Sequence, residues 1–150
     1  MAVLREQLET TLGIDEAFAF VGDFANSAQW DPGVATSVRV DPGPVRVGAT
    51  YQLGVRVGGR VAPMTYTVTH LEVPRRVVLE GVGAGVKATD DIRFEPSARG
   101  TTINYTADIR LVGLRRLLAP FAGGALRKIA ESARAGMQRA LDERAAARGR

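Results

Sequence analysis

The stretch from Val34 to Leu111 constrains the fold most, because apolar and polar residues alternate there in segment after segment. Alternation with a period of two is typical of strands that bury one face. Turns rich in glycine or proline separate these segments, and the Gly58-Gly59 pair is a hairpin signal. Six strands are expected, at residues 34–40, 49–57, 61–73, 76–82, 86–95 and 101–111. Such short connections predict an antiparallel meander, because parallel neighbours need long crossovers.

Other patterns flank this predicted sheet on both sides. Residues 2–10 are expected to form one further strand, and Asp15 to cap a short helix that follows it. A second short helical turn is expected to end at the Trp30–Gly33 segment, where proline and glycine break the chain. From about Leu114 to Ala147, apolar residues recur every three or four positions, which predicts one long amphipathic helix.

Together these elements predict an α+β fold in a single domain over residues 1–150. A curved antiparallel sheet of about seven strands would wrap around the long C-terminal helix. The two short helices would follow the first strand. The apolar stripe of the long helix has to be buried, and the concave face of the sheet is the surface available to bury it.

Composition excludes several kinds of site. The chain has no cysteine and one histidine, which excludes a cysteine nucleophile, disulfides, zinc fingers and multi-histidine metal sites. We therefore expect neither a metal nor a cofactor. The sequence has no run of 18 apolar residues, and acidic residues stand where a signal peptide has its apolar core. These features predict a cytoplasmic protein.

The net charge of +4 originates in the C-terminal segment. Residues 115–150 hold nine basic and three acidic residues, and the rest of the chain is slightly acidic. We interpret the basic residues as the solvated face of the long helix, and we expect no nucleic-acid partner, because no nucleic-acid motif accompanies them. Contact of this face with an anionic membrane, or with a protein partner, remains an alternative. Both a monomer and a homodimer remain open.

Five segments carry a resemblance to known proteins. Residues 20–26 and 30–34 read FVGDFAN and WDPGV, residues 71–81 read LEVPRRVVLEG, and residues 91–96 and 100–105 read DIRFEP and GTTINY. These stretches resemble the bacterial polyketide cyclase/dehydrase-like proteins of the START-like (SRPBCC) superfamily. The resemblance implies a helix-grip fold with a cavity between the sheet and the long helix. Its members include aromatase/cyclases and binders of lipids and quinones.

Strand parity identifies the side chains expected to face this cavity. The opposite parity carries polar residues such as Gln52 and Arg93, so it is assigned to the outer face. The resemblance suggests that Trp30 lines the entrance, although it would also serve as a packing anchor for the short helices. The expected ligand-binding residues are Trp30, Tyr51, Leu53, Met64, Tyr66, Val68, Asp90 and Tyr105, with Leu118 and Phe121 on the long helix.

Three residues are candidates for proton transfer. Asp90 shares the parity of apolar neighbours, and a carboxylate in such surroundings has a raised pKa and suits general acid–base catalysis. His70 shares the parity of Tyr66 and would act as a proton shuttle near neutral pH. The Tyr66 hydroxyl completes this catalytic set. The alternatives are a solvated or arginine-paired Asp90 and an exposed His70 at a strand end.

These residues leave two hypotheses for the function. The first is a protein that binds an apolar or aromatic small molecule, of the polyketide, lipid or quinone type, without changing it. The second is a cyclase, aromatase/dehydratase or isomerase that acts on a polyketide-like substrate in the same cavity. The shortage of converging titratable groups favours the first hypothesis.

Overall fold

The computed structural model describes residues 2–114, 116–117 and 123–148. Its elements, in chain order, are β1 (Ala2–Thr10), α1 (Ile14–Val21), the 3-10 helix η1 (Phe24–Asn26), α2 (Ser27–Trp30), β2 (Val34–Arg39), β3 (Thr50–Val57), β4 (Arg60–Glu72), β5 (Arg76–Gly83), β6 (Val86–Pro96), β7 (Thr101–Leu111) and α3 (Gly123–Arg148). This order is the one predicted from the sequence.

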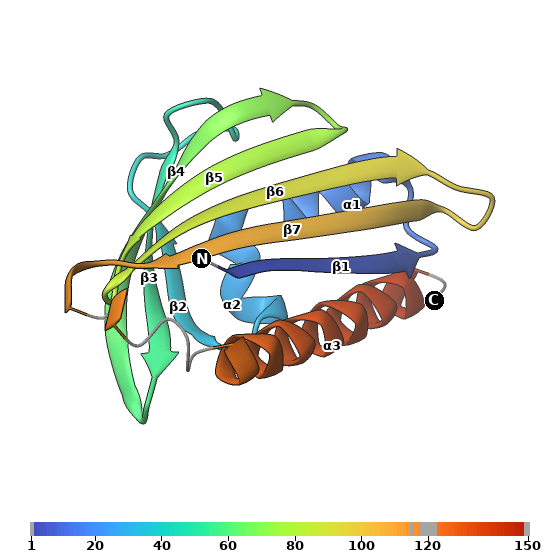
Figure 1. Cartoon of the computed structure of the whole chain (residues 1–150). Helices are drawn as coiled ribbons and strands as arrows, with labels where there is room; N and C mark the ends of the chain where they lie inside the picture. The colour runs from blue at the N-terminus through green and yellow to red at the C-terminus, as the bar shows by residue number, and fades with distance from the viewer. Residues whose placement is uncertain (1, 115, 118–122, 149–150) are drawn as a thin grey trace.

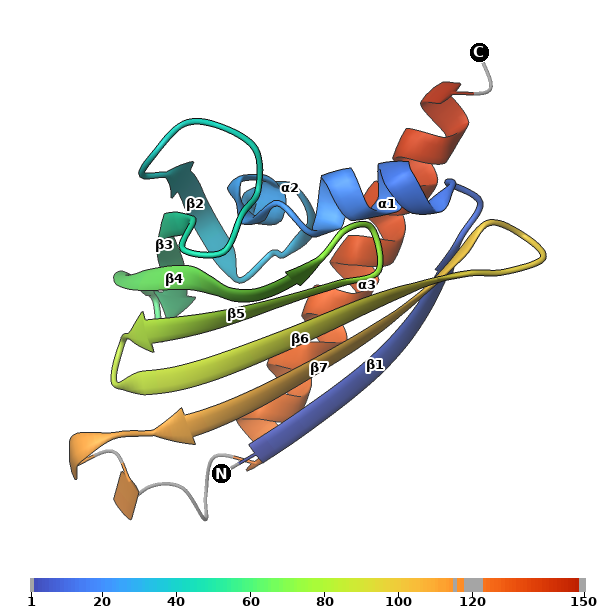
Figure 2. The same cartoon turned by 90° about the horizontal axis from the view of Figure 1, so that it is seen from above.

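One seven-stranded antiparallel sheet forms the body of the molecule, in the order β1-β7-β6-β5-β4-β3-β2. The sheet curves, and α3 runs along its concave side, where it packs against β1 and α2 (Figure 1). Seen from above, α3 passes beneath the strands, and α2 lies beside β2 (Figure 2). α1 lies farther along and contacts β6. The predicted α+β helix-grip architecture is confirmed.

Two helix boundaries differ from the expectation. α1 has Gly13 at its N-cap, and Asp15 lies in the first turn, where its carboxylate faces the positive end of the helix dipole. Within the described residues, α3 begins at Gly123 rather than near Leu114. Leu114 and Leu117 are 87% and 76% exposed, so their apolar spacing does not reflect a face buried on the sheet. In the described part of the chain no helix is long and apolar enough to cross a membrane.

Of the two orientations that the sequence left open for His70, the structure shows the exposed one and not the inward one. The pairing of β4 with β5 shifts register between Val68 and His70, which marks a β-bulge. A bulge adds one residue to a strand and so reverses the side on which the following side chains lie. Tyr66 and Val68 therefore face the core, whereas His70 is exposed on the outer side.

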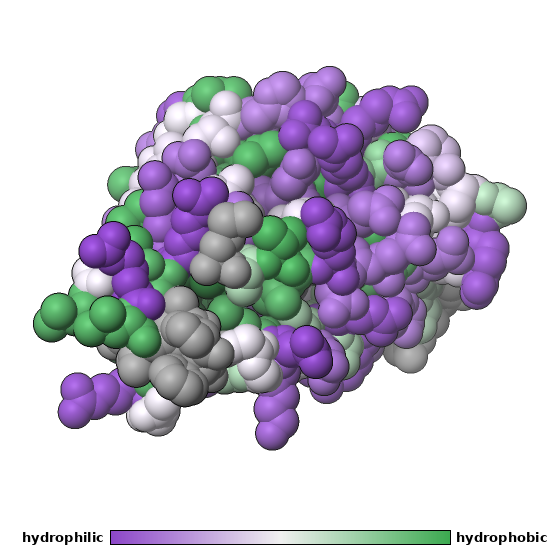
Figure 3. Space-filling model, viewed as in Figure 1, coloured by the Kyte–Doolittle hydropathy of each residue, from purple (hydrophilic) through white to green (hydrophobic). Residues whose placement is uncertain are grey.

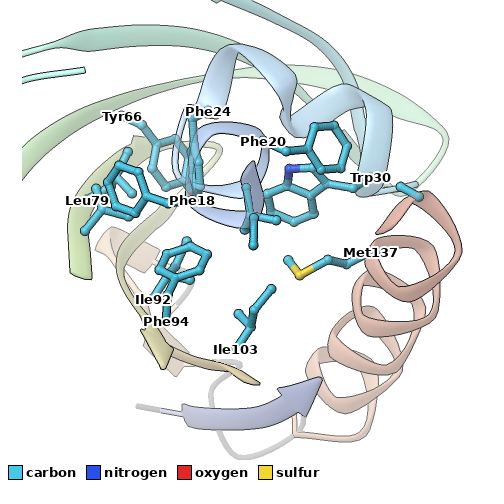
Figure 4. Close-up of a cluster of buried hydrophobic side chains, with 14 of the residues drawn as sticks. Phe18, Phe20, Phe24, Trp30, Tyr66, Leu79, Ile92, Phe94, Ile103 and Met137 are labelled. Carbon is cyan, nitrogen blue, oxygen red and sulfur yellow. The ribbon is translucent and has the colours of Figure 1, made fainter. Parts of the chain in front are cut away.

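The core fills the space between the inner face of the sheet and the helices. Figure 4 shows Ile92, Phe94 and Ile103 on the sheet side and Met137 of α3 pointing into the same interior. The rings of Phe18 and Phe94 meet edge to face with centroids 5.2 Å apart. This aromatic contact stabilises the packing of α1 against β6.

Gly136 sets how closely α3 approaches the α2 segment. A Cβ at this position would lie only 2.4 Å from the backbone oxygen of Trp30, so a larger residue would push the helix outward. The close approach brings Met137 beside the segment that carries Trp30 and Asp31. On the outside, hydrophilic side chains cover most of the face in Figure 3, and apolar ones gather toward its left end, where the chain leaves β7.

Candidate functional site

A cavity of about 140 Å³ lies between the concave face of the sheet and α3. Ala107 and Ile109 of β7 and Leu8 of β1 give it an apolar floor, and Ala133 and Met137 of α3 face them across the space. Alanines at these positions leave room that larger side chains would fill. The cavity is therefore built from small or flexible apolar residues on three different elements.

A second space of about 80 Å³ adjoins the first, toward β2 and β3. The same five residues line both spaces: Trp30, Asp31, Tyr66, Asp90 and Tyr105. Three aromatic rings and two carboxylates are thus gathered at the point where the spaces meet. These five residues are called the cavity cluster below.

Local strand geometry places the two tyrosines of the cavity cluster. Tyr66 on β4 lies opposite Gly81 on β5, and a Cβ at Gly81 would lie 2.5 Å from the Tyr66 ring. The missing side chain at Gly81 lets the phenol ring lie flat over the strand. Tyr105 on β7 lies diagonally across from Asp90 on β6, within reach of its carboxylate.

Asp90 is the most buried acidic side chain of the cavity cluster. It is 6% exposed, and its Oδ2 accepts a hydrogen bond of 2.5 Å from the Tyr105 hydroxyl. Burial raises the pKa of Asp90 to about 7; the Tyr105 hydrogen bond opposes this rise and the nearby Asp31 charge adds to it. Asp90 therefore changes charge near neutral pH, which suits a group that accepts and returns a proton.

Asp31 is the second carboxylate of the cavity cluster, and it was not among the site residues predicted from the sequence. Its Oδ1 accepts a hydrogen bond of 2.8 Å from the Gly33 backbone N–H, which holds the side chain in a tight turn. Burial raises the pKa of Asp31, and the Gly33 hydrogen bond opposes the rise. The Trp-Asp-Pro-Gly turn is the sequence pattern that could have indicated Asp31, because it places an aspartate directly beside a buried tryptophan.

The two phenols of the cavity cluster are neutral in the physiological pH range. Burial raises the pKa of Tyr66 well above its usual range, and the Asp90 charge adds to this effect. Burial likewise raises the pKa of Tyr105, and its hydrogen bond to Asp90 favours the protonated hydroxyl. Both residues are therefore hydrogen-bond donors rather than proton acceptors.

The structure places the predicted ligand-binding residues in three groups. Trp30, Tyr66, Asp90 and Tyr105 line both spaces, and Leu53 lines the smaller one. Tyr51, Met64 and Val68 are buried in the hydrophobic core and line neither of the two spaces. Leu118 and Phe121 lie outside the described residues.

His70, the third proton-transfer candidate, does not join the cavity cluster. Its Nε2 lies 2.7 Å from a Glu72 carboxylate oxygen, and both side chains are about half exposed. The pair sits on the outer face of the sheet, beyond the bulge. A proton shuttle to the cavity cannot start from this position.

Sequence reasoning also missed the contribution of α3 and β1. Arg134 of α3 and Glu6 of β1 line the edge of the larger space and approach each other to 3.5 Å. Helical periodicity identified an apolar stripe on α3, but it could not say which residues lie over the cavity. In the described part of the chain no three His, Asp or Glu residues come together as a metal site would require.

A comparison with known protein families shows which family this chain belongs to. The family described as polyketide cyclase/dehydrase and lipid transport matches residues 1–147. The chain belongs to this family. No curated protein sequence matches it.

Solved structures agree with the family assignment at the level of the fold. A START superfamily protein from Mycobacterium smegmatis is 16% identical, with a TM-score of 0.74 and 97% of each chain covered. The Zhui aromatase/cyclase from a Streptomyces species is 15% identical, with a TM-score of 0.78, 99% of this chain and 96% of that chain covered. A Thermus thermophilus protein is 13% identical, with a TM-score of 0.76, 93% of this chain and 97% of that chain covered. This family member therefore has a START-like fold.

Proposed function

We propose that this protein binds a small aromatic molecule in the cavity between the sheet and α3, with the ring of the ligand in the apolar part of that cavity. The observation that supports the proposal is the size and lining of the larger space. Its volume of about 140 Å³ is close to the ~150 Å³ of a dry apolar cavity that holds a benzene molecule. It is well below the ~300–1,000 Å³ of sites for drug-sized ligands. One ring fits this space, and a substituent would extend toward the smaller one.

The experiment fills the cavity from α3. Ala133 lines the larger space, whereas Ala135 on the same helix is exposed. We expect Ala133→Phe to weaken toluene and benzyl alcohol binding at least tenfold, and Ala135→Phe to leave it unchanged. Trp30 is the single tryptophan of the chain and lies in the cavity cluster, so its fluorescence reports binding. Saturable binding that is equally insensitive to both substitutions would contradict the proposal.

A second candidate function, an enzyme of the cyclase or aromatase/dehydratase type, is favoured by the Asp90–Tyr105 pair. With its pKa near 7, an ionised Asp90 would take a proton from a carbon next to a ketone. The resulting enolate would expel a hydroxyl group from the neighbouring carbon, and the Asp90 proton would leave with that hydroxyl as water. The Tyr66 hydroxyl would donate a hydrogen bond to the ketone oxygen, where negative charge develops.

Turnover of a β-hydroxyketone, followed by mass spectrometry as loss of water, separates the two candidates. If the protein is an enzyme, Asp90→Asn removes turnover and keeps the binding of toluene. Asp91→Asn, the neighbouring change on the outer face, keeps both. Saturable binding of the substrate without loss of water would leave the binding function and reject the enzyme for this substrate class.

A further inference from the structure

Charged groups at the cavity fall into two sets with different partners. At the edge of the larger space, Glu6 faces Arg134 at 3.5 Å, so these two charges compensate each other. In the cavity cluster, Asp31 accepts a hydrogen bond from Gly33 and Asp90 accepts one from Tyr105. Within the described residues neither of these two carboxylates forms an ion pair, so their negative charge has no cationic counterpart.

Among the residues that the structure describes, Arg56 is the cation that lines the smaller space, and its guanidinium bonds outside that space. Its Nη1 donates a hydrogen bond of 2.6 Å to the Pro32 carbonyl oxygen at the outer rim. It therefore stays at the surface and leaves the carboxylates inside uncompensated.

Aromatic rings line the same two spaces as these carboxylates. The Trp30 and Tyr105 ring centroids lie 6.1 Å apart, and those of Trp30 and Phe24 lie 5.9 Å apart. Tyr66 adds a further ring that lines both spaces. The negative face of an aromatic ring attracts a cation, most strongly where water is excluded. Rings and buried carboxylates in one cavity are complementary to an aromatic ligand that also carries a positive charge.

We propose that the ligand of this cavity carries a protonated amino group on a short arm of its ring, with the ammonium held by Asp31 and Asp90. The inference rests on the proposed function, because it requires that the ring occupies the larger space. There the ring would pack against Met137 and Ala133. The arm would extend toward the meeting point of the two spaces, where both carboxylates lie.

The charge of the ligand determines how its affinity depends on pH. An ammonium binds the ionised form of Asp90, so its affinity increases as Asp90 loses its proton. A neutral ligand hydroxyl forms a hydrogen bond with either the protonated or the ionised form of Asp90. An anionic ligand is repelled by the ionised form. The groups that face Asp90 are Asp31, Tyr66 and Tyr105, and both phenols stay protonated throughout the neutral range. Glu6 and Arg134 lie at the edge of the same space as a pair.

Benzylamine and benzyl alcohol have nearly the same shape and differ in charge, so they form a matched pair of probes. With the pKa of Asp90 at about 7, its ionised fraction increases about tenfold between pH 6 and pH 8. We expect benzylamine affinity to increase by up to about tenfold over this interval. Benzyl alcohol affinity should change by less than about twofold, and at pH 8 benzylamine should bind at least tenfold tighter.

Substitutions test whether Asp31 and Asp90 cause the tighter binding of benzylamine. Asp90→Asn should remove the increase in benzylamine affinity between pH 6 and pH 8 and lower that affinity about tenfold at pH 8, while leaving benzyl alcohol unaffected. Asp31→Asn keeps the acceptor for the Gly33 N–H and should lower benzylamine affinity about tenfold while leaving benzyl alcohol unaffected. Asp91→Asn is the control, because Asp91 pairs with Arg76 on the outer face and should alter neither probe.

The two probes also separate failure of this inference from failure of the proposed function. One outcome is that benzyl alcohol binds, that Ala133→Phe weakens this binding, and that benzylamine binds no tighter than benzyl alcohol at pH 8. This outcome would overturn the ammonium proposal and leave the ring-binding function standing. If neither probe binds, both are overturned. Tighter benzylamine binding that survives in both Asp31→Asn and Asp90→Asn would also overturn the assignment of the ammonium to these carboxylates.

Discussion

Asp90 and Asp91 are neighbours on β6, yet they lie in opposite environments. Asp90 faces the concave side, is 6% exposed and has the Tyr105 hydroxyl as its hydrogen-bond partner. Asp91 faces outward, where Arg76 donates two hydrogen bonds to its carboxylate. Burial raises the pKa of Asp90, whereas for Asp91 partial burial is outweighed by Arg76 and Arg93 and the pKa is lowered.

The difference shows that sheet parity separates the chemistry of this protein into two faces. The inner face holds Asp90, which forms no ion pair among the described residues, and two neutral phenols next to a cavity. The outer face holds ion pairs that are partly exposed to water, such as Asp91 with Arg76. Substitutions on the inner face should therefore alter stability and binding strongly and with a characteristic pH dependence, and those on the outer face should not.

The largest contrast is expected for apolar residues. Ile92 is fully buried on the inner face, and Ile92→Ala should lower the free energy of unfolding by about 2–5 kcal/mol because it leaves a void. Val82 is 58% exposed on the outer face, and Val82→Ala should cost less than about 0.5 kcal/mol. Urea denaturation measures both. Equal losses would contradict the assignment of the two faces.

A pH-dependent contrast is expected for the carboxylates. The folded-state pKa of Asp90 lies above its unfolded value, so ionisation of Asp90 lowers stability as pH increases from about 4 to about 7. Asn does not ionise, so Asp90→Asn should be more stable than the parent protein at pH 8, by up to about 4 kcal/mol, and the advantage should shrink toward pH 4. Denaturation midpoints at both pH values test this. An advantage that is equal at both would argue against a buried, ionisable Asp90.

The Tyr105 hydroxyl should matter only while Asp90 is ionised. Tyr105→Phe removes the donor to Asp90 and should cost about 1–2 kcal/mol at pH 8. It should also raise the pKa of Asp90 further, because the hydrogen bond favours the ionised form. Carbon-13 NMR of the carboxyl group follows this pKa directly. In the Asp90→Asn background the same substitution should cost clearly less, and an undiminished cost would contradict the coupling.

A smaller effect is expected at Asp91. Its pKa is lowered in the folded state, so its contribution is present above the unfolded pKa of about 4 and is lost as pH falls below it. Because Asp91 and Arg76 are both partly exposed, Asp91→Asn should cost no more than about 1 kcal/mol at pH 7. High salt should reduce this cost further. A larger, salt-insensitive loss would show that the pair is not a surface interaction.

The smallest effect is expected at His70. His70→Ala should change the free energy of unfolding by less than about 0.5 kcal/mol, because the side chain is half exposed and pairs with an exposed Glu72. Binding of toluene and benzylamine should be unaffected. A change in either affinity, measured by Trp30 fluorescence, would show that His70 influences ligand binding in the cavity.

Part of the candidate site was predictable from sequence because strand parity is a local property. Asp90, Tyr66 and Tyr105 could be assigned to the inner face from their own neighbours. The same rule failed at His70, because the register shift after Val68 depends on how β4 pairs with β5. It also did not separate Tyr51, which lines neither space, from Tyr66, which lines both.

The sequence by itself determined the meander, the long helix and the face on which each regular strand residue lies, because these follow from periodicity and short turns. Only the tertiary structure decided where a void remains, because that depends on side chains from β1, β7 and α3 that meet across the sheet. It also brought Asp31, from a turn, beside Asp90, from a strand 59 residues later. Their electrostatic coupling arises from this proximity and from exclusion of water, which no local pattern contains.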